Sequence, residues 1–280
     1  MPKVLSQEQI RQFEEEGAVR RVRLMSRQDA IILRQEIERF ENRYPNLKGQ
    51  MDFKANRIMA CVNQACQTPR LLDIMEDLLG PDLLLWNATF RIKQNDGKGH
   101  ADWHQDTAYI KLKPLLAICW MAINDVPEKA GCLQIIPGSH KGPLLSHREG
   151  DDPDSILSRA QYIDQDLDTS SAISLPLEAG EACIFNHAVI HASGPNTAKE
   201  RRIGLLMDFL PTSAIKQGGR DTATLVRGED HHGHFDLETT AVDDDPYVNL
   251  EAQKNALRAI TATMYEGSAY TPKGLTGEQS

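Results

Sequence analysis

The tetrapeptide Trp103-His104-Gln105-Asp106 places a histidine and a carboxylate two residues apart in a segment with the character of a β-strand. Side chains alternate between the two faces of a strand, so His104 and Asp106 are expected to point the same way. A second histidine stands far downstream, in His191-Ala192-Ser193-Gly194-Pro195-Asn196. Two imidazoles and one carboxylate form the facial triad that holds Fe(II) and leaves coordination positions open. The sequence therefore predicts a metal site built from distant segments.

Other histidines offer alternative sites, and a chance His-x-Asp pair is common. His187 and His191 are four apart, as on a zinc-binding helix. However, Val189-Ile190 favours a strand, and Gly194-Pro195 would break a helix. The cluster His231-His232-Gly233-His234 offers another set of metal ligands, but it falls in a polar segment for which a solvated loop is the simpler interpretation.

Arg202 follows His191 by eleven residues and leads into an apolar strand. If residues 196–200 form a hairpin turn, Arg202 returns on the paired strand and points back toward the metal. A fixed guanidinium there suits bidentate capture of the remote carboxylate of a dicarboxylic acid. The alternative is a surface arginine paired with Glu200 or Asp208. Spacing and context favour the first interpretation.

These segments resemble the phytanoyl-CoA dioxygenase (PhyH) family of Fe(II)- and 2-oxoglutarate-dependent oxygenases, from about residue 5 to about residue 235. The resemblance implies that His104, Asp106 and His191 are the catalytic iron ligands and that Arg202 anchors 2-oxoglutarate. The other implied cosubstrate contacts are Ser193, Trp120, Lys93 and Thr89. Thr89 is shorter than the side chain usual at its position. The family hallmark at residues 137–141 is explained by turn chemistry, so His140 receives no catalytic role.

The resemblance also implies the reaction. O2 and 2-oxoglutarate are consumed, succinate and CO2 are released, and an unactivated C–H bond of a small molecule is hydroxylated. Halogenating relatives lack the carboxylate ligand that Asp106 supplies, so halogenation is not expected. Desaturation, epoxidation and cyclisation stay open, as does an acyl-CoA substrate. A zinc hydrolase using the same ligands and a non-catalytic jelly-roll binding module are alternatives from other classes.

Candidate substrate contacts come from strands near the metal and from a lid-like segment, residues 226–235. They are Asn87, Arg91, Thr107, Tyr109, Gln134 and Arg227. Several of these side chains are polar or cationic, whereas an acyl-CoA would need a long apolar channel. We therefore expect a small polar or anionic metabolite, such as an amino acid or an aminophosphonate.

Composition bounds the class of protein. The 280 residues are 40% hydrophobic and 25% charged, and the net charge of −9 argues against a general nucleic-acid binder. The five cysteines include no Cys-x-x-Cys pair, which indicates reduced thiols. No signal peptide or membrane-length apolar run is evident. We expect a cytoplasmic monomer or homodimer with no membrane partner.

Short strands separated by turn signals, with helices before them, predict an α+β fold: a double-stranded β-helix (jelly-roll) core with helices packed outside it. We expect a single oxygenase domain over 1–280, with a mainly helical part (1–81), the core (82–212), and a lid-like loop and C-terminal helix (213–280). A capping box at Ser6 and Gln9 begins the first helix. Lys54 and Arg57 are either anion contacts or solvated charges, and the second interpretation is favoured. A helix over about 26–42 is expected to bury Ile31, Ile32, Ile37 and Phe40.

Overall fold

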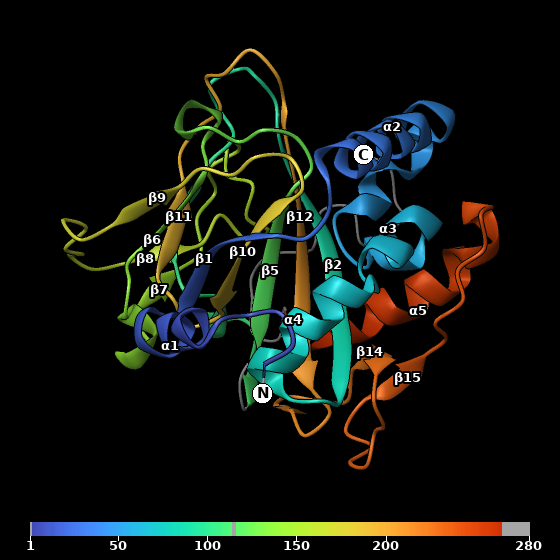
Figure 1. The fold of residues 1–280 in the computed structure, drawn as a ribbon. Helices are drawn as coiled ribbons and strands as arrows, with labels where there is room; N and C mark the ends of the chain where they lie inside the picture. Colours follow the sequence, from blue (N-terminus) through green and yellow to red (C-terminus); the bar gives the residue numbers. More distant parts are fainter. Residues whose placement is uncertain (1, 114–115, 265–280) are drawn as a thin grey trace.

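Two β-sheets form the centre of the protein, in a computed structural model that describes residues 2–113 and 116–264 (Figure 1). The larger sheet has the order β1 (Ala18–Arg23), β10 (Glu181–Asn186), β5 (Ala117–Ala122), β12 (Arg202–Pro211), β2 (Leu83–Lys93), β14 (Thr222–Arg227) and β15 (Asp236–Glu238). The smaller sheet has the order β3 (Ala101–His104), β11 (His191–Ser193), β6 (Leu133–Ile135) and β9 (Ile173–Leu175). Two short ribbons pair β4 (Leu112–Lys113) with β13 (Ile215–Lys216), and β7 (His147–Arg148) with β8 (Tyr162–Ile163).

Apolar side chains from both sheets meet in one inner core, which makes the pair a jelly-roll sandwich. Its members include Trp86, Ile118 and Phe185 from the larger sheet and Leu133 and Ile135 from the smaller one. The predicted α+β jelly-roll fold is confirmed. The predicted hairpin is wrong, because β11 lies in the smaller sheet and β12 in the larger one. The segment between them crosses from one sheet to the other, so Arg202 and His191 approach the interior from opposite layers.

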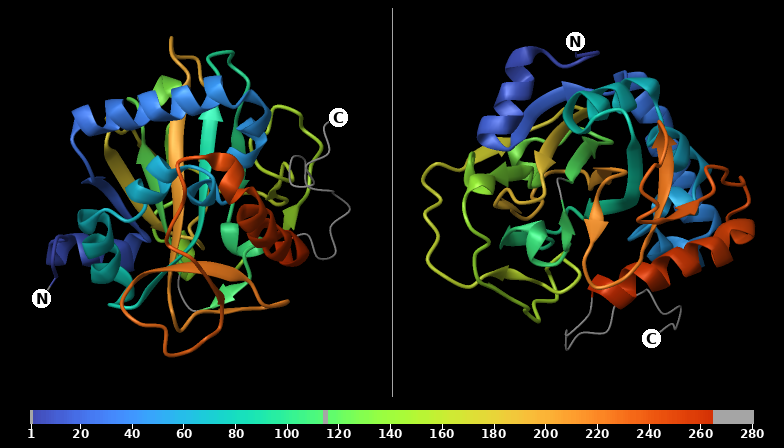
Figure 2. Two further views of the ribbon diagram at one scale, coloured as in Figure 1. Left: turned by 90° about the vertical axis from the view of Figure 1, so that its right-hand side faces the viewer. Right: turned by 90° about the horizontal axis from the view of Figure 1, so that it is seen from below.

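Helices cover the outer face of the larger sheet (Figure 2). The α-helices are α1 (Gln7–Glu16), α2 (Arg27–Arg43), α3 (Ala60–Ala65), α4 (Pro69–Leu79) and α5 (Pro246–Met264). The short 3-10 helices are η1 (Pro45–Met51), η2 (Ala55–Arg57), η3 (Asp106–Ala108), η4 (Glu128–Ala130) and η5 (Ser139–Lys141). On β12, Ile203 and Leu205 face outward and join Ile37 of α2 and Ile74 of α4 in a second apolar core. The same strand therefore separates an outer core from the inner one.

The capping box of α1 agrees with the sequence-based prediction, whereas the buried face of α2 differs from it in part. Around α1 the capping box is present, because the Ser6 hydroxyl accepts from the Gln9 backbone N–H at 3.1 Å and the Gln9 side chain accepts from the Ser6 N–H at 2.9 Å. In α2 the expected burial of Ile31 and Ile32 is wrong, since they are 39% and 47% exposed. The expected burial of Ile37 and Phe40 is confirmed, and the helical repeat turns Ala30 and Leu33 inward with them.

Lys54 and Arg57 were expected to be solvated, and this too is wrong. Both are buried, and the Lys54 ammonium lies 2.6 Å from a Glu238 carboxylate oxygen. The hydroxyls of Thr222 and Thr224 donate to the same carboxylate. Burial alone would raise the pKa of Glu238, but Lys54 and these hydroxyls lower it. Strand β15 is therefore fixed to η2 through a buried, fully bonded ion pair.

Replacement of Glu238 by glutamine should lower the free energy of unfolding by about 2 kcal/mol, because the buried Lys54 ammonium loses its countercharge. The folded-state pKa of Glu238 is lowered, so its contribution is present above pH ~4.3 and is lost as the pH falls. Urea unfolding at pH 7 and at pH 4 measures both effects. Asp236→Asn on the same strand, where the ion pair is exposed, is the matched control and should change stability by less than ~0.5 kcal/mol. Equal losses in the two variants would contradict this role.

The C-terminal helix α5 covers residues 246–264, close to the predicted 249–265, and its expected end near Gly267 lies outside the described residues. None of the described helices combines the length and apolar character needed to cross a bilayer. The five cysteines are free thiols, as their spacing predicted.

Candidate active site

Three predicted ligands meet between the two sheets. His104 ends β3, Asp106 begins η3, and His191 begins β11 directly opposite His104 in the sheet register. The Nε2 atoms of His104 and His191 lie 3.5 and 3.7 Å from the two carboxylate oxygens of Asp106. All three donor atoms fall within 4.8 Å of one another, and no other such group occurs among residues 2–113 and 116–264. This spacing fits one ion held by three donors.

Backbone contacts fix both imidazole rings. His104 Nδ1 donates to the Asp102 carbonyl at 2.7 Å, and His191 Nδ1 donates to the Val189 carbonyl at 2.9 Å. A carbonyl can only accept, so each ring carries its proton on Nδ1 and presents the lone pair of Nε2 to the centre. The arrangement orients the rings as metal ligands require.

The charge states also suit a divalent cation. Burial, with His104 nearby, lowers the pKa of His191 to about 4, so this imidazole is neutral at pH 7. Burial opposes ionisation of Asp106, but positive charge on His191 and His104, when these rings are protonated, outweighs it and holds its pKa well below the usual range. Neutral imidazole nitrogen and an ionised carboxylate are the donors that non-haem iron takes in a facial triad. The residues present therefore fit Fe(II).

Two buried basic side chains lie side by side at one end of the site. Arg202 and Lys93 are directly paired across β12 and β2, and both are almost fully buried. The Lys93 ammonium donates to the Ser193 hydroxyl at 2.6 Å and to the carbonyls of Ser193 and Gly194. Arg202 donates to the Gly131 carbonyl, but its Nε has no partner. Among the described residues no carboxylate forms an ion pair with either cation, so this end of the site is prepared for an anion.

Burial disfavours the charged form of both basic side chains. Burial, together with Arg202, lowers the pKa of Lys93 to about 6, and burial lowers the pKa of Arg202 to about 9. An anion bound here would offset this cost and favour both charged forms.

Two glycines allow Arg202 to take its position. Gly131 has a left-handed φ of +67°, and a Cβ there would lie 2.0 Å from the Gly194 carbonyl oxygen. This conformation presents the Gly131 carbonyl to Arg202. At Gly204 a Cβ would lie 2.3 Å from the Trp120 ring, so only glycine lets the indole approach the strand. The Arg202 guanidinium carbon lies 5.2 Å from the centre of that ring, in a cation–π contact.

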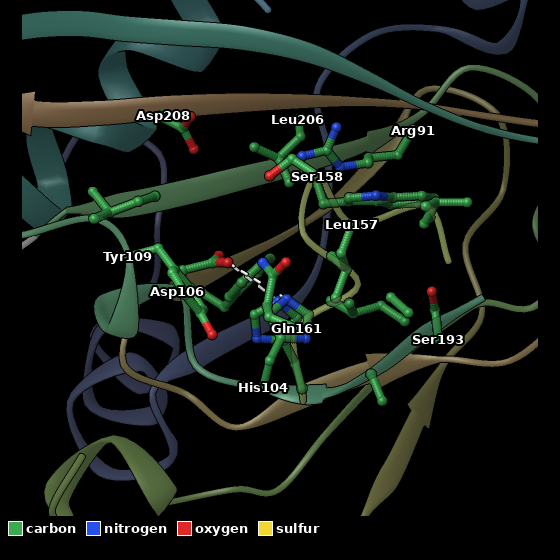
Figure 3. Close-up of a pocket in the computed structure, with 18 of the residues that line it drawn as sticks. Arg91, His104, Asp106, Tyr109, Leu157, Ser158, Gln161, Ser193, Leu206 and Asp208 are labelled. Atoms are coloured by element: carbon green, nitrogen blue, oxygen red, sulfur yellow. Dashed lines mark ion pairs between the residues drawn. The ribbon is translucent and has the colours of Figure 1, made fainter. Parts of the chain in front are cut away.

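Arg202 and the triad line the same cavity. Figure 3 shows this cavity with His104 and Asp106 on one side and Arg91, Leu206 and Asp208 on the other. Three of the six predicted substrate residues line it: Asn87, Arg91 and Tyr109. Of the predicted cosubstrate residues, Arg202, Ser193 and Trp120 line it. The remaining wall is mostly apolar, with Phe53, Trp86, Ile110, Leu133, Ile156, Leu157, Phe185 and Leu206.

The other predicted contacts lie elsewhere. Gln134 follows the inward-facing Leu133 on β6, so strand alternation turns it away, and its amide donates to Ser174. Arg227 pairs with Asp73 and Glu76 on α4, at 2.6 and 2.8 Å, and no residue of 226–235 is in the cavity wall, so the structure does not place the expected lid over the cavity. Thr107 is not in the cavity wall.

Thr89 is fully buried behind the cavity wall, and its hydroxyl accepts from the Asn87 amide at 2.7 Å. No surface of Thr89 is open to a cosubstrate in this arrangement. Lys93 also lies behind the wall and reaches the cavity through Ser193.

The cover of the cavity comes instead from the loop between β7 and β8. Leu157, Ser158 and Gln161 line the cavity from this loop. Arg159 in this loop stacks over the Tyr109 ring at 4.9 Å, which joins the cover to the segment after Asp106. These residues carry no sequence signal, because irregular loops have no repeat to detect.

Asp208 is a second residue that sequence reasoning missed. A β-bulge between β12 and β2 gives β2 one extra residue: Asp208 pairs with Asn87, and Phe209 already pairs with Leu85. Trp86 and Asn87 therefore both reach the cavity although they are adjacent in sequence. Asp208 faces the same interior from β12.

The alternative histidine sites are not formed. His187 lies in the turn before β11, so no helix presents it together with His191. His231, His232 and His234 lie in a loop on the surface, and the first two are exposed.

Comparisons with known proteins agree with this geometry. A sequence model of the family described as phytanoyl-CoA dioxygenase (PhyH) matches residues 1–204. A probable phytanoyl-CoA dioxygenase of Caenorhabditis elegans is 34% identical over 47% of this chain and 45% of its own. A probable alpha-ketoglutarate-dependent hypophosphite dioxygenase of Stutzerimonas stutzeri is 26% identical over 55% of this chain and 54% of its own. The chain thus spans about half the length of these curated relatives.

A solved structure described as a non-heme monooxygenase, ThoJ in its apo form, superposes with a TM-score of 0.83 at 25% identity. The match covers 92% of this chain and 98% of that chain. The likeness therefore includes the sheets, the helices outside them and the layer between the sheets where the triad lies.

Proposed function

Because this chain belongs to the phytanoyl-CoA dioxygenase family of Fe(II)- and 2-oxoglutarate-dependent oxygenases, we propose that it oxidises a small polar or anionic metabolite with O2 and 2-oxoglutarate. Hydroxylation of an unactivated C–H bond, with release of succinate and CO2, is the proposed outcome. The observation that carries the proposal is the facial triad beside two buried cations that lack a carboxylate partner. Binding of a metal alone does not require the buried Arg202 and Lys93, whereas binding of a dicarboxylate that chelates the metal does.

Separate groups of residues would bind the metal, orient the cosubstrate and exclude water. His104, Asp106 and His191 would hold Fe(II), which supplies the chemistry that couples decarboxylation of the 2-oxo acid to oxidation of a C–H bond. Arg202 pairs with the remote carboxylate of 2-oxoglutarate and thereby fixes its direction. Phe185 and Leu206 give the cavity apolar walls that exclude water.

Arg91 supports an anionic substrate. Its guanidinium lines the cavity, forms no ion pair among the described residues, and donates only to the neighbouring Phe90 carbonyl at 3.4 Å. A cation held in a cleft with unused donors is suited to a carboxylate or phosphonate. The hypophosphite dioxygenase relative, whose named substrate is a small anion, also supports an anionic substrate.

The proposed activity is tested by anaerobic titration and by a substrate screen. Fe(II) with 2-oxoglutarate should give a weak visible charge-transfer band, which neither a zinc hydrolase nor a binding module would produce. The screen should then use succinate release to compare amino acids and phosphonates with phytanoyl-CoA. Stimulation by phytanoyl-CoA alone would overturn the proposed substrate class, and the absence of the band would overturn the enzyme class.

Replacement of Arg91 by glutamine should raise KM for the anionic substrate by about 30-fold, equivalent to about 2 kcal/mol. KM for 2-oxoglutarate, held at the Arg202 end, should change less than about twofold. Steady-state succinate assays measure both constants. Arg148→Gln removes a largely exposed guanidinium and is the control. An equal rise in both KM values would show that Arg91 binds the cosubstrate instead.

We further propose that residues 1–280 form one oxygenase domain that acts in the cytoplasm as a monomer or homodimer. Gel filtration with light scattering tests the oligomeric state. A larger assembly would contradict it.

A further inference from the structure

Asp208 is a buried carboxyl group that the proposed reaction does not use. Its side chain is 2% exposed, comes from β12, and points into the cavity beyond Leu206 (Figure 3). Oδ2 accepts from the Asn87 amide at 3.2 Å, but Oδ1 has no hydrogen-bond partner. Within the described parts of the chain, no lysine, arginine or histidine forms an ion pair with it. A buried carboxylate left this way is costly unless a ligand supplies the missing donor.

The orientation of this carboxyl group is fixed from behind. Lys54 holds a left-handed backbone conformation (φ +53°), and its N–H donates to Asn87 Oδ1 at 2.8 Å. A backbone N–H can only donate, so this contact assigns the amide oxygen of Asn87 and directs its NH2 group at Asp208 and Thr89. Asp208 Oδ2 is thereby occupied as an acceptor, and Oδ1 is left open to the cavity.

Opposite charges lie at the two ends of one wall of the cavity. Arg91 and Asp208 stand on either side of Leu206, and Figure 3 shows Asp106 and His104 on the opposite wall. Burial and the nearby Asp106 carboxylate raise the pKa of Asp208 to about 7, against the lowering influence of Asn87, Arg91 and Lys54. A cation at Oδ1 would restore the ionised form.

We propose that Asp208, held by Asn87, is the subsite for a protonated amine of the substrate, whose anionic group meets Arg91. The substrate class is then a zwitterion with its two charges separated by a short carbon chain. That chain passes Leu206 and faces the triad, so carbons between the charged groups are the ones presented for oxidation. The assignment rests on the proposed function for its chemistry, but binding tests it separately.

The test compares matched probes on the enzyme loaded with Fe(II) and 2-oxoglutarate under nitrogen. The probes are ω-amino acids from 3-aminopropanoate to 6-aminohexanoate and the corresponding acids without the amine. Trp86 and Trp120 line the cavity, so tryptophan fluorescence reports Kd. At one or more chain lengths the amine should strengthen binding at least about tenfold, as expected for a charge-assisted hydrogen bond.

Asp208→Asn should reduce this preference to less than about twofold while Kd for the plain acid stays within about twofold of wild type. Arg91→Gln should weaken both members of each pair and keep the preference. Asp208→Ser gives the same comparison if the asparagine variant does not fold. The inference is overturned if no chain length shows a preference, or if the preference survives in the Asp208 variants. Loss of the charge-transfer band in the wild-type protein would instead count against the proposed function.

Discussion

Asp106→Ala should abolish tight binding of Fe(II) and reduce succinate formation by at least about 10³-fold, because two imidazoles alone leave the ion without its anionic ligand. In the wild type, Fe(II) should raise the unfolding temperature by mass action, since it binds only the folded protein. In Asp106→Ala the metal should give no such rise. Metal stoichiometry by elemental analysis and thermal unfolding with and without Fe(II) measure the effect under nitrogen.

Asp102→Ala is the matched control, since it removes a half-exposed carboxylate from β3, the strand that ends at His104. The control keeps the Asp102 backbone carbonyl that accepts from His104. Its metal content and its metal-induced stabilisation should equal those of the wild type. If Asp106→Ala still binds one equivalent of Fe(II) with unchanged affinity, the carboxylate is not a ligand and the triad is wrong.

The triad was predictable because its information is local. Only Gln105 separates His104 from Asp106, and its extended backbone (φ −120°, ψ 128°) carries the alternation of β3 past the end of the strand. The partner histidine follows from family resemblance and from a strand-like environment. The jelly roll was predictable for a similar reason, since short apolar segments between turns show its strands one by one.

The inward orientation of Asn87 was hidden by a change of strand phase in β2. Strict alternation from Leu84 and Trp86 would send Asn87 outward and away from the inner core. The bulge at Trp86 reverses the phase, so Asn87, Thr89, Arg91 and Lys93 all turn inward. No residue type in β2 indicates the extra residue, because the bulge arises from the pairing of β2 with β12. The sequence and the family resemblance had already placed these four residues near the metal, and the pairing with β12 explains why they share the inner face with Trp86.

Long-range ion pairs were the other source of error. Lys54 meets Glu238, and Arg227 meets Asp73, across 184 and 154 residues of sequence. Lys54 was interpreted as solvated and Arg227 as a substrate contact, because neither has a partner nearby in the sequence. Tertiary packing brings Glu238 to Lys54, which becomes buried. It also pairs Arg227 with Asp73 on α4, which holds the arginine away from the cavity.

Arg202→Gln should raise KM for 2-oxoglutarate by about 10³-fold, or about 4 kcal/mol, because the remote carboxylate would lose its guanidinium in a buried setting. The maximal rate at saturating 2-oxoglutarate should fall less, since the triad is untouched. Anaerobic titration of the charge-transfer band gives Kd, and succinate assays give KM. Arg201→Gln removes the adjacent guanidinium, which pairs with Glu41 at 2.6 Å on the outer side, and should leave both constants unchanged.

The same variant separates an anchoring role from a structural one. In the cosubstrate-free protein Arg202 is a buried cation without a carboxylate partner, so neutral glutamine should not lower the unfolding temperature. In the presence of 2-oxoglutarate, the wild type should gain stability and Arg202→Gln should gain far less. A variant that unfolds more easily without cosubstrate, yet binds 2-oxoglutarate with wild-type affinity, would show that Arg202 serves the fold through Gly131 and Trp120. The paired cations Arg202 and Lys93 would then need another anion.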